Sequence, residues 1–287
     1  MKPAPEIVYT PEAPLRNPFQ LLRRIIADNW ERRELCAQLF WRNIKAQYRQ
    51  TFLGLLWIFL PAIVSAAVWI FLFSFRVVQF DNPVSQSQYI AYVLVGMILW
   101  QSFVEAYSAP INSFQQNRAM MTKINFPREV IILVSLCEVF FNALIRCFVM
   151  VPILLWLVPE VSMTGATFLF PVMFAGLILT GITVGLWLVP IGALYMDVGR
   201  VLTMVTPVWM VLTPIIYPTP TTWPANLLVY ANVASPTLIT ARDFLLGQSS
   251  GFAMLGWVYV LGVIPVFLLG LLVFRISIPI LLERSGS

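Results

Sequence analysis

Three ionisable side chains lie within stretches of the sequence that are otherwise apolar: Glu105, Glu138 and Arg146. A charge inside a membrane is costly, so such residues usually face the interior of a helix bundle or water. Glu138 and Arg146 project from similar faces of one helix, so a pair between them needs an intermediate partner or another chain. Two interpretations stay open: these residues join helices through ion pairs and hydrogen bonds, or they belong to a pathway through the bundle.

Other kinds of chemistry are disfavoured by the residue counts. The chain has no His, which removes imidazole acid–base chemistry and the commonest zinc ligand. Cys36, Cys137 and Cys147 show no paired spacing, and the last two lie in an apolar stretch, so they are interpreted as small core residues. A proton relay is disfavoured because one or two carboxylates without His make a short chain. We therefore expect no catalytic residue and no metal site.

The composition is that of a membrane protein. Of 287 residues, 59% are apolar and 11% are charged, with a mean hydropathy of +0.82, whereas a soluble domain is about 25% charged. Crossing the hydrocarbon takes about 20 mostly apolar helical residues. Six stretches qualify or nearly do: 52–75, 89–111, 130–158, 166–195, 201–217 and 253–275. We expect an all-α membrane protein with six transmembrane helices. Gly181 and Gly185 of the fourth span have the spacing that lets helices approach closely.

The distribution of Lys and Arg predicts the orientation, because basic residues concentrate in cytoplasmic loops. If the N-terminus is cytoplasmic, fifteen of the eighteen basic residues fall on the inner side. The outer loops then hold only Arg76 and Arg242, and Arg146 lies inside a span. We therefore expect both termini to face the cytoplasm.

The N-terminal part is expected to lie outside the hydrocarbon. Residues 1–15 are rich in Pro and charge and predict a flexible cytoplasmic tail. In residues 16–51, apolar side chains recur every three or four positions and basic residues fill the other face. This pattern predicts one or two amphipathic helices at the inner membrane interface, with Arg42, Lys45 and Arg49 toward anionic headgroups. An ordinary solvated helix is the alternative. Because the segment runs directly into a span, nucleic-acid binding is not expected.

The segment 218–250 follows the fifth span and is broken by several Pro residues. Its two apolar runs, "ANLLVYANV" and "PTLITARDFLLG", are each too short to cross a membrane. Non-helical backbone at membrane depth is tolerated only where protein or a water-lined cavity satisfies it. We expect two short re-entrant helices over the outer mouth of a pathway, and the alternative is an outer loop with a helix resting on the bilayer. The expected residues of this outer gate are Tyr217, Trp223, Asn232 and Arg242.

Aromatic residues are abundant for so few charges. Trp and Tyr at the ends of spans usually form interface belts. The alternative is that some rings line a passage and stack on sugar faces, whose C–H groups are apolar while their hydroxyls require hydrogen bonds. The candidate pathway residues are Trp57, Trp69, Phe73, Tyr89, Glu105, Glu138 and Arg146.

Export of a large hydrophilic substrate needs an energy source, and this chain lacks the usual nucleotide site. A P-loop places a Lys after a Gly-rich turn, where it holds the β- and γ-phosphates of ATP. The last Lys of the chain is Lys123, and it is preceded by "MMT". The chain therefore cannot bind ATP in that way. An ATP-driven transporter would need a separate ATPase subunit that carries the ATP and Mg²⁺.

Four passages carry a resemblance to a known family. They are "RNIKAQYRQTFLGLLWIFLPAI" (42–63), "NRAMMTKINFPREVI" (117–131), "ALYMDVGRVL" (193–202) and "TPIIYP" (213–218), the last followed by "ARDFLLG" (241–247). Their order and spacing resemble the permease subunits of ABC transporters that export polysaccharides: O-antigen, capsule and teichoic-acid polymers. The chain departs from the family after Asn232, where relatives tend to place Pro directly. Here Pro236 follows four positions later, which leaves open how the second outer helix starts.

The resemblance implies that the inner loop, 112–129, contains a short coupling helix that docks into a groove on the ATPase. The residues expected to make this contact are Asn117, Arg118, Lys123, Asn125, Phe126, Pro127 and Arg128. The alternative is that the basic residues only enforce orientation, but the Asn and Pro residues give the loop more shape than orientation requires.

The resemblance further implies the membrane permease of an ATP-driven exporter in a bacterial cytoplasmic membrane. Its substrate would be a polysaccharide linked to a polyprenyl diphosphate, received at the inner leaflet by Arg42, Lys45 and Arg49. Six spans are too few to enclose a sugar chain, so two copies are expected to pair about a two-fold axis, joined by two ATPase subunits. Two other functions stay open: an ABC exporter of a small amphipathic molecule or drug, and a membrane enzyme that acts on lipid-linked sugars.

Overall fold

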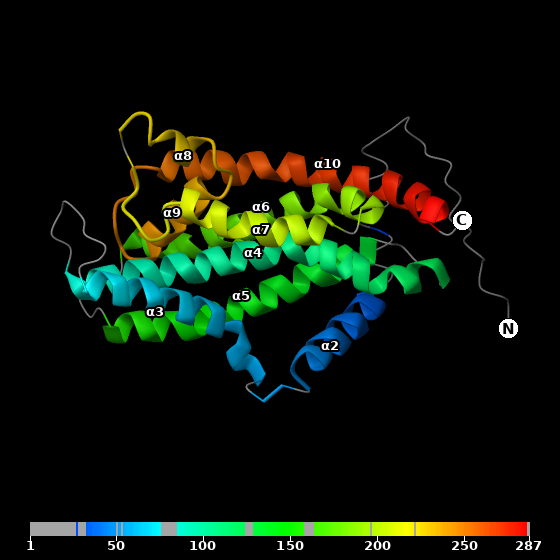
Figure 1. Ribbon diagram of the computed structural model, residues 1–287, viewed down its shortest axis with the longest axis horizontal. Coiled ribbons are helices and arrows are strands. Elements are labelled where there is room, and N and C mark those ends of the chain that lie inside the picture. Colours follow the sequence, from blue (N-terminus) through cyan, green and yellow to red (C-terminus); the bar gives the residue numbers. More distant parts are fainter. Residues whose placement is uncertain are drawn as a thin grey trace.

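The computed structural model describes residues 33–49, 51–52, 54–75, 85–123, 129–157, 164–195, 197–220 and 222–285, together with residue 27. Every regular element in these ranges is a helix. The longer helices run side by side along the longest axis of the molecule, and α2 (Arg33–Arg49) crosses them at an angle (Figure 1). The tail 1–15 and most of 16–32 lie outside the described residues.

Four helices in the described part of the chain are long and apolar enough to cross a membrane. They are α4 (Gln86–Lys123), α5 (Glu129–Leu157), α6 (Phe170–Leu194) and α10 (Ala253–Ser285). Two further apolar helices are shorter, α3 (Leu60–Ser74) and α7 (Val198–Leu212). The all-helical class expected from the sequence is confirmed.

Helix α6 forms the centre of the packing, with its most extensive contacts to α4 and α10. The approach to α4 depends on two glycines. A Cβ at Gly181 would lie 2.6 Å from the Cβ of Ala106, and a Cβ at Gly185 would collide with the backbone oxygen of Tyr107. Two helices can come this close only where small residues face the neighbour. The spacing of these glycines therefore predicted a real close contact.

The first predicted span, 52–75, is not one continuous helix. A 3₁₀ helix, η1 (Gly54–Ile58), comes first, and α3 begins after Phe59. Gly54 has a φ of 51°, a conformation that favours glycine. Pro61 lies in the first turn of α3, where its missing N–H costs no helical hydrogen bond. The continuous helix expected from residue 52 is corrected to a short turn followed by a helix.

The second predicted span ended at residue 111, before a loop at 112–129. Helix α4 instead continues to Lys123, so much of the expected loop is helical. Ile111 and Phe114 are both buried in a cluster with side chains of α5 and α6, and this packing extends the helix beyond the apolar stretch. Residues 124–128 lie outside the described part of the chain.

Other helix ends also differ from the predicted limits. Helix α7 ends at Leu212 rather than 217, because Thr213 is extended (φ −99°, ψ 130°), and a residue that precedes a proline, here Pro214, is disfavoured in the helical region. A 3₁₀ helix, η2 (Gly165–Leu169), precedes α6, and α10 runs to Ser285 rather than 275.

Two short helices cover the end of the bundle that lies away from the C-terminal end of α10 (Figure 1). They are α8 (Leu227–Tyr230) and α9 (Ser235–Leu245). Helix α9 packs against α4, α6 and α10, and ten of its eleven side chains are buried. A helix that is buried all round belongs to the interior of the fold. Two short helices are thus present where the sequence predicted them, and α9 is an internal element.

Candidate functional site

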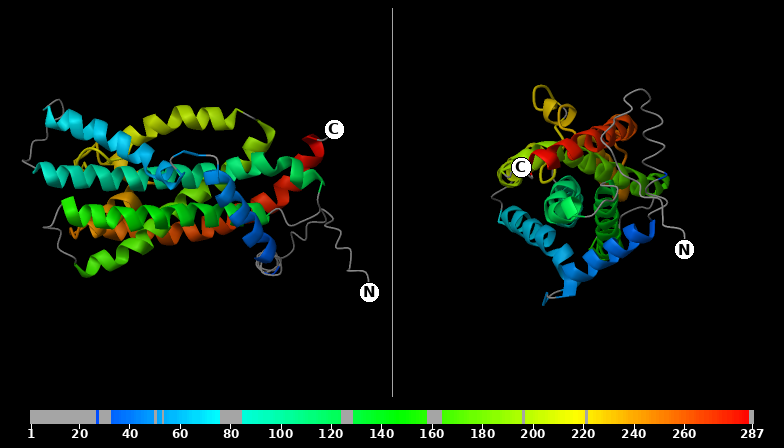
Figure 2. Two further views of the ribbon diagram at one scale, coloured as in Figure 1. Left: turned by 90° about the horizontal axis from the view of Figure 1, so that it is seen from below. Right: turned by 90° about the vertical axis from the view of Figure 1, so that its right-hand side faces the viewer.

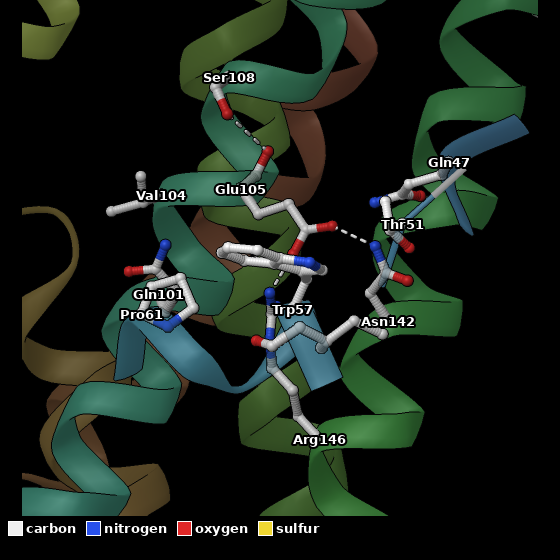
Figure 3. Close-up of a pocket in the computed structure, with 11 residues that line it drawn as sticks. Gln47, Thr51, Trp57, Pro61, Gln101, Val104, Glu105, Ser108, Asn142 and Arg146 are labelled. Atoms are coloured by element: carbon white, nitrogen blue, oxygen red, sulfur yellow. Dashed lines mark hydrogen bonds and ion pairs between the residues drawn. The ribbon is translucent and has the colours of Figure 1, made fainter. Parts of the chain in front are cut away.

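A cavity of about 440 Å³ lies where η1, α3, α4, α5 and the end of α2 meet. Eleven residues line it: Gln47, Thr51, Trp57, Ile58, Pro61, Gln101, Val104, Glu105, Ser108, Asn142 and Arg146. Figure 3 shows the side chains of Trp57, Glu105, Asn142 and Arg146 gathered in the same space. The exposed side chains of Gln47, Thr51 and Trp57 mark its rim. An apolar bundle therefore contains a cavity whose wall is about half polar.

An ion pair between two helices forms part of this wall. Arg146 on α5 lies with Nη2 at 2.5 Å from Oε2 of Glu105 on α4. The other carboxylate oxygen of Glu105 accepts a hydrogen bond from Nδ2 of Asn142, one turn from Arg146 on α5. Opposite charges in the low dielectric of a bundle attract strongly, and a carboxylate whose two oxygens are both occupied is well compensated. The pair therefore joins α4 to α5.

Arg146 has two further partners, so its charge is held from several sides. Its Nε donates to the backbone oxygen of Ile58 at 3.3 Å, and its Nη1 donates to the hydroxyl of Ser102 at 3.2 Å. The Arg146 side chain is 6% exposed, and that of Glu105 is 24% exposed. The guanidinium thus ties η1, which ends at Ile58, to the two helices of the wall. Of the two interpretations left open by the sequence, the ion pair is present between Glu105 and Arg146. The two residues also line a cavity, and their place in a pathway through the bundle stays a prediction.

Glu138 lies apart from this cluster. Its Oε1 accepts a hydrogen bond from Nδ2 of Asn43 on α2, at 2.7 Å. It does not line the cavity, and its contact instead joins α2 to α5. On the same α2, Leu39 and Ile44 are buried. The three charges that the sequence grouped together therefore serve two different contacts.

The aromatic candidates also separate. Trp57 lines the cavity and is 51% exposed. Phe73 stacks on Tyr89 with ring centroids 4.0 Å apart, and the hydroxyl of Tyr89 donates to the backbone oxygen of Ile216. Trp69 packs against the main apolar core. Among these four candidates only Trp57 reaches the cavity, and the other three stabilise the packing of α3 and α4.

A second arginine, on α9, has a different environment. Arg242 on α9 is 1% exposed. Its Nη1 donates to the backbone oxygen of Pro214 at 2.8 Å, and its guanidinium carbon lies 3.7 Å from the ring centroid of Tyr92 on α4. A cation over an aromatic face is stabilised by the ring quadrupole. Burial raises the pKa of the neighbouring Asp243 carboxyl above its ordinary value, while the charge of Arg242 opposes this rise. Arg242 therefore anchors α9 to α4 and to the turn after α7.

Asn232 organises the start of α9. Its Oδ1 accepts hydrogen bonds from the indole N–H of Trp209 at 2.9 Å and from the backbone N–H of Ala234 at 3.0 Å. Its Nδ2 donates to the hydroxyl of Thr213 at 2.8 Å. Helix α9 then begins at Ser235 with Pro236 in its first turn, a position that proline favours. The displaced proline of this chain is thus compatible with a normal helix start.

The remaining outer candidates are less constrained. Tyr217 donates from its hydroxyl to the backbone oxygen of Val211 at 3.0 Å, and its own backbone oxygen accepts from the hydroxyl of Tyr92 at 2.8 Å. Trp223 is 78% exposed. Of the four residues expected at the outer gate, Tyr217, Asn232 and Arg242 are each held by hydrogen bonds, and Trp223 is an exposed ring.

Comparison with known proteins decides the family of this chain. Residues 34–246, well over half of its length, match the family described as ABC-2 type transporter. The chain belongs to the ABC-2 type transporter family. The family match and the four long apolar helices together indicate a multi-pass membrane protein that belongs to a transporter.

Two relatives of this ABC-2 chain carry the same description. The O-antigen export system permease protein RfbA of Myxococcus xanthus is 25% identical over 201 residues, which cover 68% of this chain and 72% of the relative. The protein of the same description from Klebsiella pneumoniae is 23% identical over 242 residues, which cover 82% of this chain and 88% of the relative. The similarity thus extends over most of each protein.

The coupling candidates of this ABC-2 chain lie at or beyond the end of α4. Asn117 donates from Nδ2 to the backbone oxygen of Ser113 at 2.8 Å, Arg118 is partly exposed, and Lys123 is the last residue of the helix. Asn125, Phe126, Pro127 and Arg128 lie outside the described residues. The basic candidates on α2, Arg42, Lys45 and Arg49, are all exposed.

Sequence reasoning missed several residues that hold the site. Gln101, Ser102 and Asn142 are polar residues within apolar stretches of α4 and α5, and that signal was available. A second missed contact joins Glu129, the first residue of α5, to Arg275 on α10, with Nε at 3.3 Å from Oε1. Glu129 is a nearly buried acid in a first helical turn, where the helix dipole favours a negative charge. This ion pair joins α10 to the first turn of α5.

Proposed function

We propose that this chain is the membrane-spanning permease of an ATP-driven exporter that moves a polysaccharide such as O-antigen across the cytoplasmic membrane. The observation that carries the proposal is the ABC-2 family match over residues 34–246, together with two O-antigen export permeases that are similar over most of their length. The polar cavity inside an apolar bundle supports it, because a hydrophilic cargo needs polar surface at membrane depth.

In this proposal the chain crosses the membrane six times. The four long helices span it directly, and the 15-residue helices α3 and α7 span it with the help of the segments that flank them. Helices α8 and α9 then form the re-entrant outer segment. Both termini then lie in the cytoplasm, which the concentration of basic residues in the segments on that side supports.

A second copy of the chain completes the pathway. Helices α3 and α7 lie on the same side of the bundle in both views of Figure 2. Both helices expose apolar side chains, including Val64, Phe71, Met204 and Val208. A face of this kind is buried by lipid or by a partner, and pairing of two such faces about a two-fold axis would enclose a space that one bundle cannot.

Energy enters from separate ATPase subunits, which bind the ATP and Mg²⁺. The described end of α4, with Asn117 and Arg118, and the inner loop that follows it form the docking element. Movement of this loop would reach α10 through the ion pair of Glu129 and Arg275. The exposed Arg42, Lys45 and Arg49 would attract a lipid diphosphate at the inner leaflet, since basic residues near an anionic surface gain about 1 kcal/mol each.

The test is deletion of the gene in its own organism, followed by complementation. Surface polymer should disappear, lipid-linked polymer should accumulate on the cytoplasmic side, and the intact gene should restore export. A variant of the ATPase subunit that lacks its P-loop lysine should give the same phenotype. Normal surface polymer in the deletion strain would refute the proposed function.

A further inference from the structure

We propose that the cavity bounded by η1, α4 and α5 is a subsite for the first sugar unit of a lipid-linked polymer, while the diphosphate stays outside on the basic face of α2. This inference rests on the proposed function, and it names the part of the substrate that the cavity recognises.

The described wall of the cavity carries one acid and one base, and they neutralise each other. Glu105 and Arg146 form an ion pair at 2.5 Å. The remaining donors of Arg146 are directed to the backbone oxygen of Ile58 and the hydroxyl of Ser102. A phosphate that entered would lose its hydration without gaining an uncommitted cation, which is unfavourable. The cavity is therefore suited to a neutral ligand.

The polar groups that remain are of the kind that bind hydroxyls. Gln47 and Gln101 each offer an amide with two donors and an acceptor, and neither amide has a hydrogen bond within the described part of the chain. Ser108 donates to the backbone oxygen of Glu105 at 3.1 Å and keeps its own acceptor capacity. A sugar carries several hydroxyls that both donate and accept. These amides and the hydroxyl can pair with the hydroxyls of a sugar, whereas an apolar ligand would leave them without partners.

The apolar part of the wall complements the other face of a sugar ring. Trp57 is half exposed at the rim, and Pro61 and Val104 line the cavity beside it. An indole offers a broad, rigid apolar face with little rotamer entropy to lose. The C–H groups on one side of a pyranose can pack on such a face while its hydroxyls turn to the amides. Trp57 is held next to the ion pair because Ile58, its neighbour, is bound by Arg146 (Figure 3).

The size and position of the cavity fix which part of the substrate it takes. About 440 Å³ lies toward the lower end of the range of about 300–1,000 Å³ for small-molecule sites. The cavity therefore holds a short piece of a polymer. Gln47 at its rim lies on α2, and the exposed Lys45 and Arg49 lie one turn apart on another side of the same helix. A diphosphate attracted to α2 by these basic residues would hold the sugar attached to it beside the helix that forms part of the rim.

The experiment compares two lipid probes that differ only in one sugar. The full chain, in the complex in which it purifies, is placed in lipid nanodiscs. Binding is measured for a polyprenyl diphosphate that bears a single N-acetylhexosamine and for the same polyprenyl diphosphate without sugar. We expect the sugar-bearing probe to bind about tenfold more tightly, the gain of one or two additional hydrogen bonds and a stacked face.

Substitutions then locate that preference. Trp57→Leu and Gln101→Leu should each reduce it to threefold or less without changing the affinity for the sugar-free probe. Trp41→Leu is the matched control, because Trp41 is 53% exposed on α2 and does not line the cavity, and it should keep the full preference. Arg49→Ala should weaken both probes by the same factor.

Three outcomes would overturn the inference: no preference in the unaltered chain, a full preference in the Trp57→Leu and Gln101→Leu double variant, or loss of preference only in Arg49→Ala. Elution of each variant as an intact complex shows that it folds. Surface polymer measured in strains that carry the same variants reports the proposed function separately, so that the exporter can stand even if the subsite fails.

Discussion

Two arginines lie inside this helix bundle, and the protein treats them differently. Arg242 on α9 is 1% exposed and contacts a backbone oxygen and an aromatic ring, with its closest carboxylate oxygen, on Asp243, 3.9 Å away. Arg146, in the middle of α5, is paired to the carboxylate of Glu105 at 2.5 Å and lines a cavity. Arg242 therefore lies in a closely packed region, whereas Arg146 lies beside a cavity.

This difference separates two regions of the molecule. In the first region, Arg242 and Asn232 hold α9 and the turn after α7 through hydrogen bonds to the backbone and to a hydroxyl. In the second region, Glu105 neutralises the charge of Arg146, and Gln47, Gln101 and Trp57 line a cavity. The first region is closely packed, whereas the second contains the space that the proposed subsite would use.

The largest effect is expected from Arg242→Ala. The substitution removes the cation over Tyr92 and leaves the oxygen of Pro214 without its donor, a loss of about 3 kcal/mol. The midpoint of thermal unfolding should fall by about 10 °C, measured in detergent by intrinsic fluorescence. Arg242→Lys, which keeps the charge, should recover part of the loss. An unchanged midpoint in Arg242→Ala would remove the contrast between the two arginines.

A smaller effect is expected at the ion pair of Glu105 and Arg146, and part of it should be recovered when both residues are replaced. Glu105→Gln leaves a nearly buried guanidinium without its counter-charge, so it should destabilise by about 2 kcal/mol. Arg146→Gln leaves a carboxylate that reaches the cavity and water, so it should cost less. The double variant should be more stable than the sum of the two predicts, by about 1–2 kcal/mol. Additive losses in the same unfolding assay would show that the two side chains do not interact.

Removal of the contact between α2 and α5 tests whether α2, which forms part of the rim of the cavity, is held independently of α9. Asn43→Ala removes the donor to Glu138, a part-buried bond to a charged group that is worth about 1 kcal/mol. Backbone hydrogen exchange in α2 should accelerate several-fold, while exchange in α9 stays unchanged. Equal acceleration in both helices would mean that the two ends unfold together and are not independent.

The smallest effect is expected at an exposed pair. Arg200 and Asp197 are 3.0 Å apart with side chains 82% and 74% exposed, and such pairs contribute about 0–1 kcal/mol. Asp197→Asn should shift the unfolding midpoint by no more than about 3 °C. A midpoint shift as large as that expected for Glu105→Gln would contradict the view that burial decides the strength of these ion pairs.

The sequence identified the charges and the helices better than the contacts between them. Glu105 and Arg146 stood out as charges in apolar stretches, but their pairing depends on how α4 packs on α5 and cannot be read from the spacing along one helix. Gly181 and Gly185 did predict a close approach, because a missing side chain matters whichever helix is the neighbour. Arg242 was expected at a gate because it lies within the predicted outer segment 218–250. Its burial became evident only from the packing of α9 into the bundle.

Helix ends were hardest where two local signals compete. Residues 112–123 are polar enough to suggest a loop, yet buried Ile111 and Phe114 extend α4 through them. The turn at Gly54 interrupts a stretch whose hydropathy alone predicts a continuous span. In both places tertiary packing or one backbone conformation outweighs the average composition of the window.

The central claim is that this bundle moves its cargo only with work supplied by a separate ATPase. The most direct measurement places the purified chain in proteoliposomes with lipid-linked polymer, with and without its ATPase subunit, and follows delivery of polymer across the bilayer on addition of ATP. Polymer should cross the bilayer only when this chain, its ATPase subunit and ATP are all present. Delivery at full rate by this chain alone would contradict it.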